Sequence, residues 1–439
     1  MNGIVQRTDA AWAQPGDAAL LDRLQRSAFN YFVQSQNPSN GLVADTTRAG
    51  APSSIAVVGF ALSAYTVGVE RGWMDRADAI QRTLAALRFF MGSDQSGSAT
   101  ATGYRGFYFH FLDMQRGTRV WLSEVSLIDT TFLMAGILTA AAYFDACTAE
   151  ETELRSLANA LYSRTDWCWA QPEGAAVTHG WKPECGFLNY GWEGYSEAIL
   201  LYVLGLSSPT HPLTKNSFQA WTMTYQWENL YGQDFLYAGP LFVHQFSHAW
   251  IDFRGIRDAF MREKRCDYFE NSRRATYVQR EYAIRNPRSF EGYSADYWGL
   301  SAGDGPSVPP CLVACRRQAF YGYAARGVPY GPDDGTISGS ALLSSLAFAP
   351  EIVLPALRAL VACGPPEDDL ACIRASGINR TVEGAGTGEW ISEGTFGLDQ
   401  GMIVLMIENY RSGLLWRLGR ANTRLRLGLR RAGFRGGWL

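Results

Sequence analysis

The chain has little lysine, little histidine and no long uninterrupted apolar stretch. Lysine occurs only at Lys182, Lys215 and Lys264, although the 439 residues include 39 basic ones, and there are five histidines. The formal net charge of −3 gives no sign of a surface that attracts nucleic acid as a whole. No run reaches the roughly 18 apolar residues that a membrane-spanning helix needs, so we expect no membrane span.

Signatures of metal-binding and nucleotide-binding classes are also missing. No P-loop and no nucleotide-binding glycine motif occurs, so no nucleotide cofactor is indicated. None of the eight cysteines belongs to a CxxC pair, which removes the zinc-ribbon spacing. The best candidates for a disulfide are Cys363 and Cys372, which bracket a Gly-Pro-Pro loop. For most of the eight we favour free thiols, because a chain of this size does not need disulfides to fold.

Hydrophobic periodicity predicts a mostly helical chain. Residues 19–36 read as an amphipathic helix, and Ser53 and Ser54 can cap a second helix that runs to about Arg71. The second helix is apolar on more than one side, which suits the inner layer of a double-layered helical barrel. Buried and amphipathic helices alternate, and strands do not alternate with helices, so a parallel sheet is not expected. The further predicted helices are 75–91, 124–145, 150–165, 195–206, 216–230, 241–262, 267–284, 336–346, 351–362 and 397–410.

One stretch departs from this helical pattern. Residues 106–113 read GFYFHFLD, and a glycine at 117 then leads into TRVW, which predicts a small β-hairpin. No linker rich in proline, glycine or serine divides the chain, so we expect one domain over residues 17–416. The tail, residues 417–439, carries seven arginines and no acidic residue. We favour a helix packed on the body of the protein, or a disordered tail, over contact with an anionic membrane or a partner.

Acidic residues at the starts of apolar helices are the candidates for chemistry. Glycoside hydrolysis needs a proton donor and a second carboxylate, and a buried carboxyl group has the raised pKa that suits the donor. Glu197 ends the segment NYGWEGYSE ahead of the apolar run AILLYVLGL. Glu124 and Asp129 in SEVSLIDT, and Asp399 in GLDQG, stand at the starts of two other apolar helices. Helix capping and the helix dipole are the alternative explanations for these positions.

Aromatic and polar side chains are the candidates for sugar binding, because sugar rings stack on aromatic faces. His244 and His248 have the i, i+4 spacing of a zinc-binding helix. However, HQFSH lacks the glutamate of HExxH and no third ligand suggests itself, so we expect neither a metal nor a cofactor. The expected substrate-binding residues are Trp192, Glu193, Tyr195, His244, His248, Asp252, Arg254 and Trp298.

At these segments the chain resembles the glucoamylase-like family that includes the endo-β-1,2-glucanases of glycoside hydrolase family 144. It is also similar to the transglycosylase region of cyclic β-1,2-glucan synthases. The resemblance spans roughly residues 20–416. It implies an all-α fold, an (α/α)6 toroid barrel with the active site at one open end, and a glutamate acid in the GY-S/N-E segment, here Glu197. The segments that carry it include SEVSLIDTTFLMAG, NYGWEGYSEAILLYVLGL, GPLFVHQFSHAWIDFRGI and GLDQGMIVLMIENYRSG.

The resemblance leaves the second catalytic carboxylate open. Asp399 or Asp129 would serve as the base of an inverting enzyme, whereas Glu124 fits a retaining pair. We expect an endo-acting, inverting hydrolase that cuts β-1,2-glucan into short oligosaccharides. The alternatives are a retaining transglycosylase, a hydrolase of another linkage and, in a different class, a non-catalytic glucan-binding barrel. The carboxylates argue against the last, because binding alone needs aromatic residues more than acids.

The beginning of the chain bears on its compartment. Ala11-Trp12-Ala13 resembles the cleavage site of a signal peptide, but no hydrophobic segment precedes it. We therefore expect a periplasmic or secreted protein if a leader has been removed, and a cytoplasmic protein otherwise.

Overall fold

The computed structural model describes residues 13–172, 174–364, 368–384 and 388–439. The chain divides into two compact units. The first unit consists of Met1–Ala28, Gln226–Phe246 and Phe269–Gly413, and the second of Phe29–Tyr225, Ser247–Tyr268 and Leu414–Leu439. Most of the sequence that resembles a signal cleavage site, and the side chain of Cys363 with its expected disulfide, lie outside the described residues.

Two layers of helices make up much of the second unit. Three helices are buried along almost their whole length: α2 (Ile55–Glu70), α4 (Leu127–Tyr143) and α6 (Ile199–Ser207). The helices α3 (Arg76–Gly92) and α5 (Ala149–Arg164) pack against each other, and they cover α2 and α4 respectively. The layers follow from the sequence, because α2 and α4 are apolar on nearly every side whereas α3 and α5 carry arginine and acidic residues on one face.

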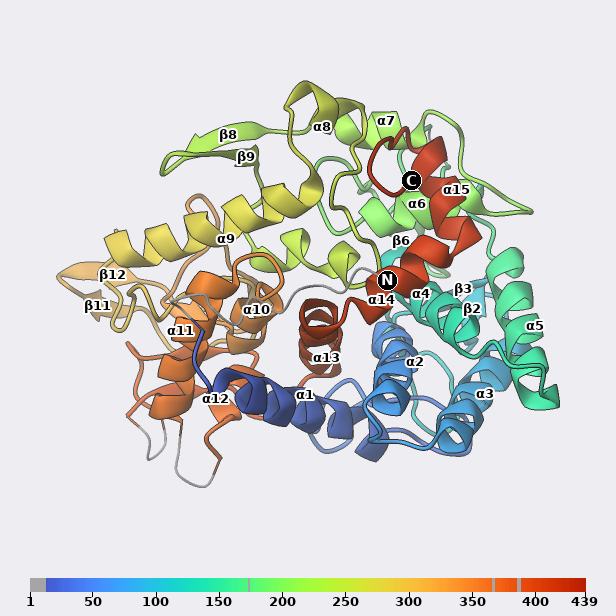
Figure 1. The fold of residues 1–439 in the computed structure, drawn as a ribbon, viewed down its shortest axis with the longest axis horizontal. Coiled ribbons are helices and arrows are strands. Elements are labelled where there is room, and N and C mark those ends of the chain that lie inside the picture. Colours follow the sequence, from blue (N-terminus) through green and yellow to red (C-terminus); the bar gives the residue numbers. More distant parts are fainter. Residues whose placement is uncertain (1–12, 173, 365–367, 385–387) are drawn as a thin grey trace. The chain divides into compact units, whose positions relative to one another are not determined.

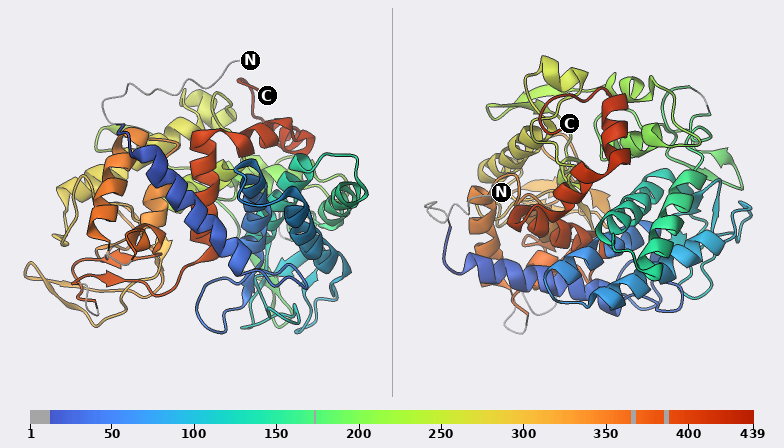
Figure 2. Two further views of the ribbon diagram at one scale, coloured as in Figure 1. Left: turned by 60° about the horizontal axis from the view of Figure 1, so that its bottom comes forward. Right: turned by 45° about the vertical axis from the view of Figure 1, so that its right-hand side comes forward.

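The helices α2 and α4 approach each other through glycine. A Cβ atom on Gly59 would lie 2.2 Å from the carbonyl oxygen of Phe132, and one on Gly136 would lie 2.0 Å from that of Gly59. Both positions therefore require glycine. Figures 1 and 2 show α2 in blue beside α4 in teal. This contact fixes the helix that carries Asp129 near its start.

A five-stranded antiparallel sheet lies at the start of α4. Its strands, in spatial order, are β2 (Gly103–Tyr104), β3 (Phe107–Phe109), β5 (Val125–Ser126), β6 (Gly180–Lys182) and β7 (Gly186–Phe187). A shorter pair joins β1 (Ser53–Ser54) to β4 (Phe111–Leu112). The prediction of a single small hairpin was therefore too limited. The additional strands are two or three residues long, which is too short for an alternating pattern to reveal.

The C-terminal residues also belong to the second unit. They form α14 (Leu414–Ala421) and α15 (Thr423–Arg431), and α15 packs on α6, where the two are seen in red and green in Figure 1. The guanidinium group of Arg431 donates to the carbonyl oxygen of Leu206 at 2.7 Å. The remaining helices of this unit are α7 (Ser217–Thr222) and α8 (Ala259–Glu263).

The first unit combines helices with short antiparallel strands. Helix α1 (Asp17–Gln34) begins in it and ends in the second unit. Its other helices are η1 (Leu241–His244), α9 (Tyr268–Arg285), α10 (Gly339–Ser344), α11 (Pro350–Cys363), α12 (Ala371–Arg374) and α13 (Gly397–Arg411). Its strands are β8 (Trp227–Leu230), β9 (Gln233–Leu236), β10 (Ala302–Gly303), β11 (Cys311–Val313), β12 (Arg316–Gln318), β13 (Ala324–Ala325), β14 (Thr336–Ile337), β15 (Ile378–Asn379) and β16 (Trp390–Ile391).

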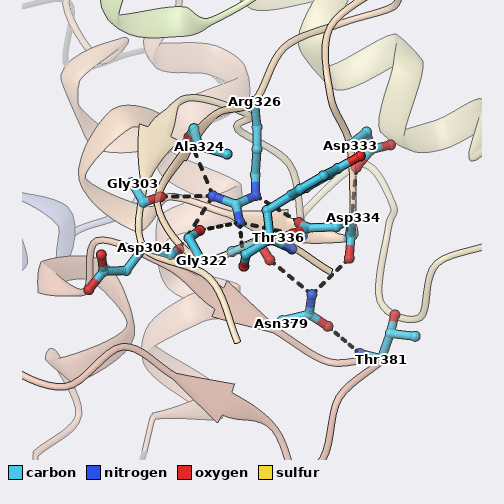
Figure 3. Close-up of polar contacts among 12 residues, drawn as sticks. Gly303, Asp304, Gly322, Ala324, Arg326, Asp333, Asp334, Thr336, Asn379 and Thr381 are labelled. Carbon is cyan, nitrogen blue, oxygen red and sulfur yellow. Dashed lines mark hydrogen bonds and ion pairs between the residues drawn. The ribbon is translucent and has the colours of Figure 1, made fainter. Parts of the chain in front are cut away.

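A buried ion pair ties the loops of the first unit together (Figure 3). Nε and Nη2 of Arg326 lie 2.7 and 2.8 Å from the two carboxylate oxygens of Asp334. The same guanidinium group donates to the carbonyl oxygen of Gly303 at 2.8 Å. Asn379 donates to the carbonyl oxygen of Asp334 at 2.9 Å and so joins the pair to β15. Because both charges are buried and hydrogen-bonded, removing either one would leave the other uncompensated.

Most of the predicted helices are present within a few residues of their expected ends, but two predictions were wrong. The segment 241–262 contains the 3-10 helices η1 and η2 (Phe246–Ala249), then a loop in which Gly255 has a φ of +75°, and then the start of α8. The segment 216–230 is helical only to residue 222. Beyond it, Tyr231 and Gly232, with φ of +52° and +78°, form the turn between β8 and β9. Within the described residues, no helix has the length and apolarity to cross a bilayer.

Candidate active site

A histidine and two carboxylates meet where the sheet of the second unit joins α4. His110 directly follows β3, and Glu124 directly precedes β5. These strands are antiparallel, with Phe109 opposite Val125, so the next pair outward is His110 and Glu124. The amide of His110 donates to the carbonyl oxygen of Glu124 at 2.9 Å. Asp129 joins them because β5 leads directly into the first turn of α4.

Asp129 is held by the cap of its own helix. Ser126 is the N-cap of α4, and its Oγ accepts from the amide of Asp129 at 3.2 Å. The same hydroxyl group donates to Oδ2 of Asp129 at 2.5 Å. Capping was the alternative explanation for Glu124, but the N-cap of this helix is Ser126, whose side chain binds Asp129. The cap also fixes the direction in which the carboxylate points.

His110 lies between the two carboxylates. Nδ1 of His110 is 3.0 Å from Oε1 of Glu124, and Nε2 is 3.4 Å from Oδ2 of Asp129. Burial alone would lower the pKa of the imidazole, but the charges of Asp129 and Glu124 outweigh it and raise the pKa to about 9. The ring also stacks on Phe111, with centroids 4.0 Å apart and planes at 11°. The raised pKa favours the imidazolium at neutral pH, which donates to Glu124 and forms an ion pair with Asp129.

Glu124 stays ionised in this setting. Burial would raise its pKa, but the hydrogen bond from His110 and the charges of His110 and Lys182 give a net lowering of the pKa. Strand β6 lies close behind the side chain, because a Cβ atom on Gly180 would be 2.9 Å from Cγ of Glu124. Glycine at this position leaves the room that the carboxylate needs.

In contrast to Glu124, Glu197 has a raised pKa. It lies two residues before α6, and its carbonyl oxygen accepts from the hydroxyl group of Ser247 at 2.8 Å. Burial of its carboxyl group, together with the negative charge of Asp129, raises the pKa of Glu197 to about 7. A carboxyl group with this pKa is partly protonated at neutral pH, which suits a proton donor.

The segment before Glu197 is aromatic and partly exposed. The indole of Trp192 stacks on the ring of His179, with centroids 4.1 Å apart. Tyr195 stacks on Tyr268 at 5.9 Å, and Glu193 is exposed. Neighbouring rings thus fix Trp192 and Tyr195 in place.

The same cluster has the composition of a metal site. One potential ligand atom from each of His110, Glu124 and Asp129 lies within 4.8 Å of the other two, and among the described residues this is the group of three or more such side chains that could hold an ion. A metal would require the neutral imidazole, whereas the raised pKa of His110 favours the imidazolium. The ligand atoms are thus close enough to hold an ion, whereas the raised pKa of His110 favours a proton in its place.

Three of the predicted residues belong to the first unit. Asp399 lies in the first turn of α13, and its Oδ1 accepts from the hydroxyl group of Ser340 at 2.8 Å. His244 is buried, and Nε2 of its ring bonds to the carbonyl oxygen of Ala238 at 3.1 Å. Trp298 is completely buried, so its ring is a core residue in this structure.

The other predicted polar residues of the second unit contact the C-terminal tail. Both oxygens of the buried Asp252 pair with Arg254, at 2.8 and 2.9 Å, and Asp252 also pairs with Arg420. The guanidinium group of Arg254 lies over the ring of Trp416. His248 is buried. His244 and His248 lie in separate 3-10 helices, where residues four apart do not share a face, so the spacing of a zinc helix is not realised.

Sequence reasoning missed the part played by His110. Its position was seen only as one member of the alternating stretch GFYFHFLD. The available signal was a single histidine at the end of an aromatic strand, in a chain with only five histidines. Trp121 was likewise read only as part of the hairpin, although it stands three residues before Glu124.

Known proteins match this chain over nearly its whole length. At 25% identity, 94% of the chain aligns with 58% of an exo-β-1,2-glucooligosaccharide sophorohydrolase (non-reducing end) from Parabacteroides distasonis. The chain thus spans less than two thirds of that curated relative. A solved structure from Bacteroides uniformis is 29% identical with a TM-score of 0.84, and the match covers 97% of this chain and 100% of that one. The endo-β-1,2-glucanase of Chitinophaga pinensis, solved with sophorotriose and glucose, is 24% identical with a TM-score of 0.82, over 96% and 99% of the two chains, and shares the fold.

A family model confirms the resemblance that the sequence carries. The glycoamylase model, described as "Putative glucoamylase", matches residues 189–423. The matched region contains Glu197 and Asp399, whereas the cluster around His110 precedes it. Since the match covers more than half of the chain, the protein belongs to this glucoamylase-like family.

Proposed function

We propose that this protein is a glycoside hydrolase that cleaves β-1,2-glucan, with Glu197 as the general acid. The observation that carries the proposal is the pKa of Glu197, which burial and the negative charge of Asp129 raise to about 7. A carboxyl group that keeps its proton near neutral pH beside an acidic neighbour is suited to be the proton donor of acid–base glycoside cleavage. The β-1,2 linkage is supported by the name of the sophorohydrolase relative.

In this reaction the protonated carboxyl group of Glu197 donates its proton to the leaving glycosidic oxygen. A second, ionised carboxylate activates the water that attacks the anomeric carbon. We assign this role to Asp129 or Asp399. The contacts of Asp129 with Ser126 and His110 are both made by Oδ2. Oδ1 of Asp129 is therefore the oxygen that would accept a hydrogen bond from the water.

The proposal extends to the architecture and the outcome of the reaction. The alternation of buried and amphipathic helices supports an (α/α)6 barrel over residues 17–416, with residues 417–439 as a C-terminal extension. Water attack from the opposite face inverts the anomeric centre and needs carboxyl groups about 6.5–9.5 Å apart. A retaining mechanism would instead use Glu124 as a nucleophile about 5–5.5 Å from Glu197.

Exo action is the second candidate, because the sophorohydrolase relative is named as exo-acting at the non-reducing end. An endo-acting enzyme releases a ladder of short oligosaccharides from the start of the reaction. An exo-acting sophorohydrolase releases only the disaccharide. The distribution of early products therefore separates the two.

The decisive experiment is product analysis with β-1,2-glucan, laminarin, cellulose and starch in parallel. We expect cleavage of β-1,2-glucan by the wild type and a loss of about 10²–10⁴-fold in kcat for Glu197→Gln. The matched control is Glu150→Gln, which removes an exposed carboxylate at the start of α5. Circular dichroism and Tm check that both variants fold. A folded Glu197→Gln variant with normal turnover would refute the acid assignment.

Proton NMR of the first-formed product tests the stereochemistry. Inversion gives the α-anomer initially, and a β-anomer would establish a retaining mechanism. Activity on another polymer with none on β-1,2-glucan would correct the linkage. Binding without cleavage of any polymer in the panel would leave the non-catalytic, glucan-binding alternative.

A further inference from the structure

An unusual turn lies directly before Glu124. The amide of Ser123 donates to the carbonyl oxygen of Val120 at 3.1 Å, which closes a four-residue turn. Its central residues, Trp121 and Leu122, have φ of +57° and +51°. Positive φ at both central positions is the mark of a type I′ turn, which strongly prefers Asn-Gly. Two large apolar residues therefore occupy positions whose backbone conformation disfavours them.

The same two side chains are also exposed. Trp121 keeps 69% and Leu122 67% of their accessible surface. Single exposed apolar residues are common and need no explanation. Here a tryptophan and a leucine are adjacent, largely exposed and in an unfavourable backbone conformation, so turn formation does not account for them and packing does so only in small part. Strain of this kind is typical of functional sites.

The side chain of Arg119 holds the turn in place. Nε of the buried Arg119 donates to the carbonyl oxygen of Ser123 at 2.5 Å. The other guanidinium nitrogens of Arg119 bind the carboxylate of Glu184 at 2.6 and 3.0 Å, and the group lies over the ring of Phe109. The indole of Trp121 is thus presented on a supported turn.

Aromatic rings connect this turn to the carboxylates. The ring of Trp121 lies 5.1 Å from that of Phe111, and Phe111 stacks on His110 at 4.0 Å. His110 in turn binds Glu124. Trp121 is therefore two ring contacts away from the histidine that binds both Glu124 and Asp129, and all of these residues belong to the second unit.

We propose that Trp121, supported by Leu122, forms a platform that binds a glucosyl unit of the substrate outside the sugars held at the carboxylates. A β-glucopyranosyl ring has apolar C–H groups on its faces, and an exposed indole provides a matching flat surface. The inference rests on the proposed function, because it assumes a chain of glucosyl units as the substrate. A protein partner fits less well, because two residues offer far less area than a stable protein interface buries.

The test separates sugar binding from catalysis. In the Glu197→Gln background, titration calorimetry measures the affinity for sophorose and for β-1,2-glucooligosaccharides of increasing length. We expect Trp121→Ala to weaken binding of the longer chains by about tenfold, and to leave sophorose unaffected if the disaccharide occupies only the sites at the carboxylates. Trp121→Phe keeps an aromatic surface and should restore most of the affinity. Met223→Ala, which removes another exposed apolar side chain of the same unit, is the control.

Kinetics of the active enzyme give a second measurement. Trp121→Ala should raise KM for the polymer by about tenfold and lower kcat by much less, whereas Met223→Ala should leave KM at the wild-type value. Equal affinities of Trp121→Ala and its parent for long chains would overturn the platform while leaving the proposed function intact. If the wild type neither binds nor cleaves β-1,2-glucan, the proposed function fails and this inference fails with it.

Discussion

Nδ1 of His110 lies 3.0 Å from Oε1 of Glu124, in a pair set by the register of two antiparallel strands. On its other side the same ring faces Asp129. One imidazolium therefore compensates two carboxylates at the start of a buried helix. Without this cation, the two acids would compete for a proton, as carboxylates that share a site do.

The first prediction concerns the titration of His110. Its imidazole should titrate with a pKa of about 9, while burial lowers the pKa of His244 to about 4. NMR of ¹⁵N-labelled histidine should show these two rings moving in opposite directions from 6.5, with assignment by His110→Gln and His244→Gln. A His110 pKa near 6.5 would mean that the cluster is not formed in solution.

The same shift makes a prediction about stability. Because the pKa of His110 is raised on folding, its contribution is fully present below pH 6.5 and is lost as the pH rises through about 9. His110→Gln should therefore cost about 1–3 kcal/mol of unfolding free energy at pH 6 and less at pH 10. Urea unfolding at the two pH values measures the difference. A cost that is independent of pH would indicate lost packing on Phe111 instead of lost charge.

Chelation tests the competing metal interpretation of the cluster. We expect activity to survive dialysis against EDTA, because a proton on His110 occupies the position that a metal would need. Added Zn²⁺ should inhibit more strongly at pH 7.5 than at pH 6, since a larger fraction of the imidazole is then deprotonated and free to act as a ligand. Loss of activity on chelation, followed by recovery with a divalent ion, would instead identify a metal centre.

Glu197 should set the alkaline limit of activity. A general acid must be protonated, and the pKa of about 7 predicts that kcat/KM falls as the pH rises above 7. Because folding raises the pKa of Glu197, ionisation of this group destabilises the folded protein. The cost grows as the pH rises from 4.5 to 7 and stays constant above pH 7. Glu197→Gln should therefore stabilise the protein by about 1–3 kcal/mol at pH 8 and have little effect at pH 4. An alkaline limit near pH 9 would point to another acid.

Gly180 offers a test of how closely Glu124 must be positioned. A Cβ atom there would lie 2.9 Å from Cγ of Glu124 and 2.8 Å from the carbonyl oxygen of Val125, so Gly180→Ala must displace one of them. We expect kcat/KM to fall about 10–100-fold in a folded protein, as displacements of this size do in other enzymes. Gly92→Ala, where the added methyl group meets nothing within 4 Å, is the matched control. Normal kinetics of Gly180→Ala would show that the exact position of Glu124 beside His110 does not affect catalysis.

The sequence reveals the helical part of the candidate active site. The apolar runs after Glu197, Glu124 and Asp399 predict buried helices, and the structure has a helix after each of these residues. A helix repeats its pattern over many residues, so one sequence is enough to detect it. This is why the acids at the starts of helices could be singled out.

The partners of those acids could not be found in the same way. His110 and Glu124 are brought together by strands of two and three residues, and Gly180 enters from a third strand more than fifty residues later. Such short strands carry no detectable period, and their pairing is decided by the packing of the whole unit. The prediction for the segment around His244 and His248 was wrong for a related reason, since its apolar content is that of a helix but it folds into two short 3-10 helices and a loop.

The turn at Trp121 and Leu122 yields the last prediction, in which stability and binding should change in opposite directions. A left-handed conformation costs a non-glycine residue about 1–2 kcal/mol, and Asn-Gly tolerates it best. The double variant Trp121→Asn, Leu122→Gly should therefore gain about 1–3 kcal/mol of unfolding free energy and still lose affinity for long glucan chains. Trp121→Ala with Leu122→Ala is the control, because it removes the apolar surface and keeps the unfavourable φ values, so it should lose affinity without gaining stability. Denaturant unfolding and titration calorimetry on the three proteins distinguish the possibilities. If the Asn-Gly variant is less stable than the wild type, then Trp121 and Leu122 stabilise the fold. The claim that they cost stability and provide binding affinity would then be wrong.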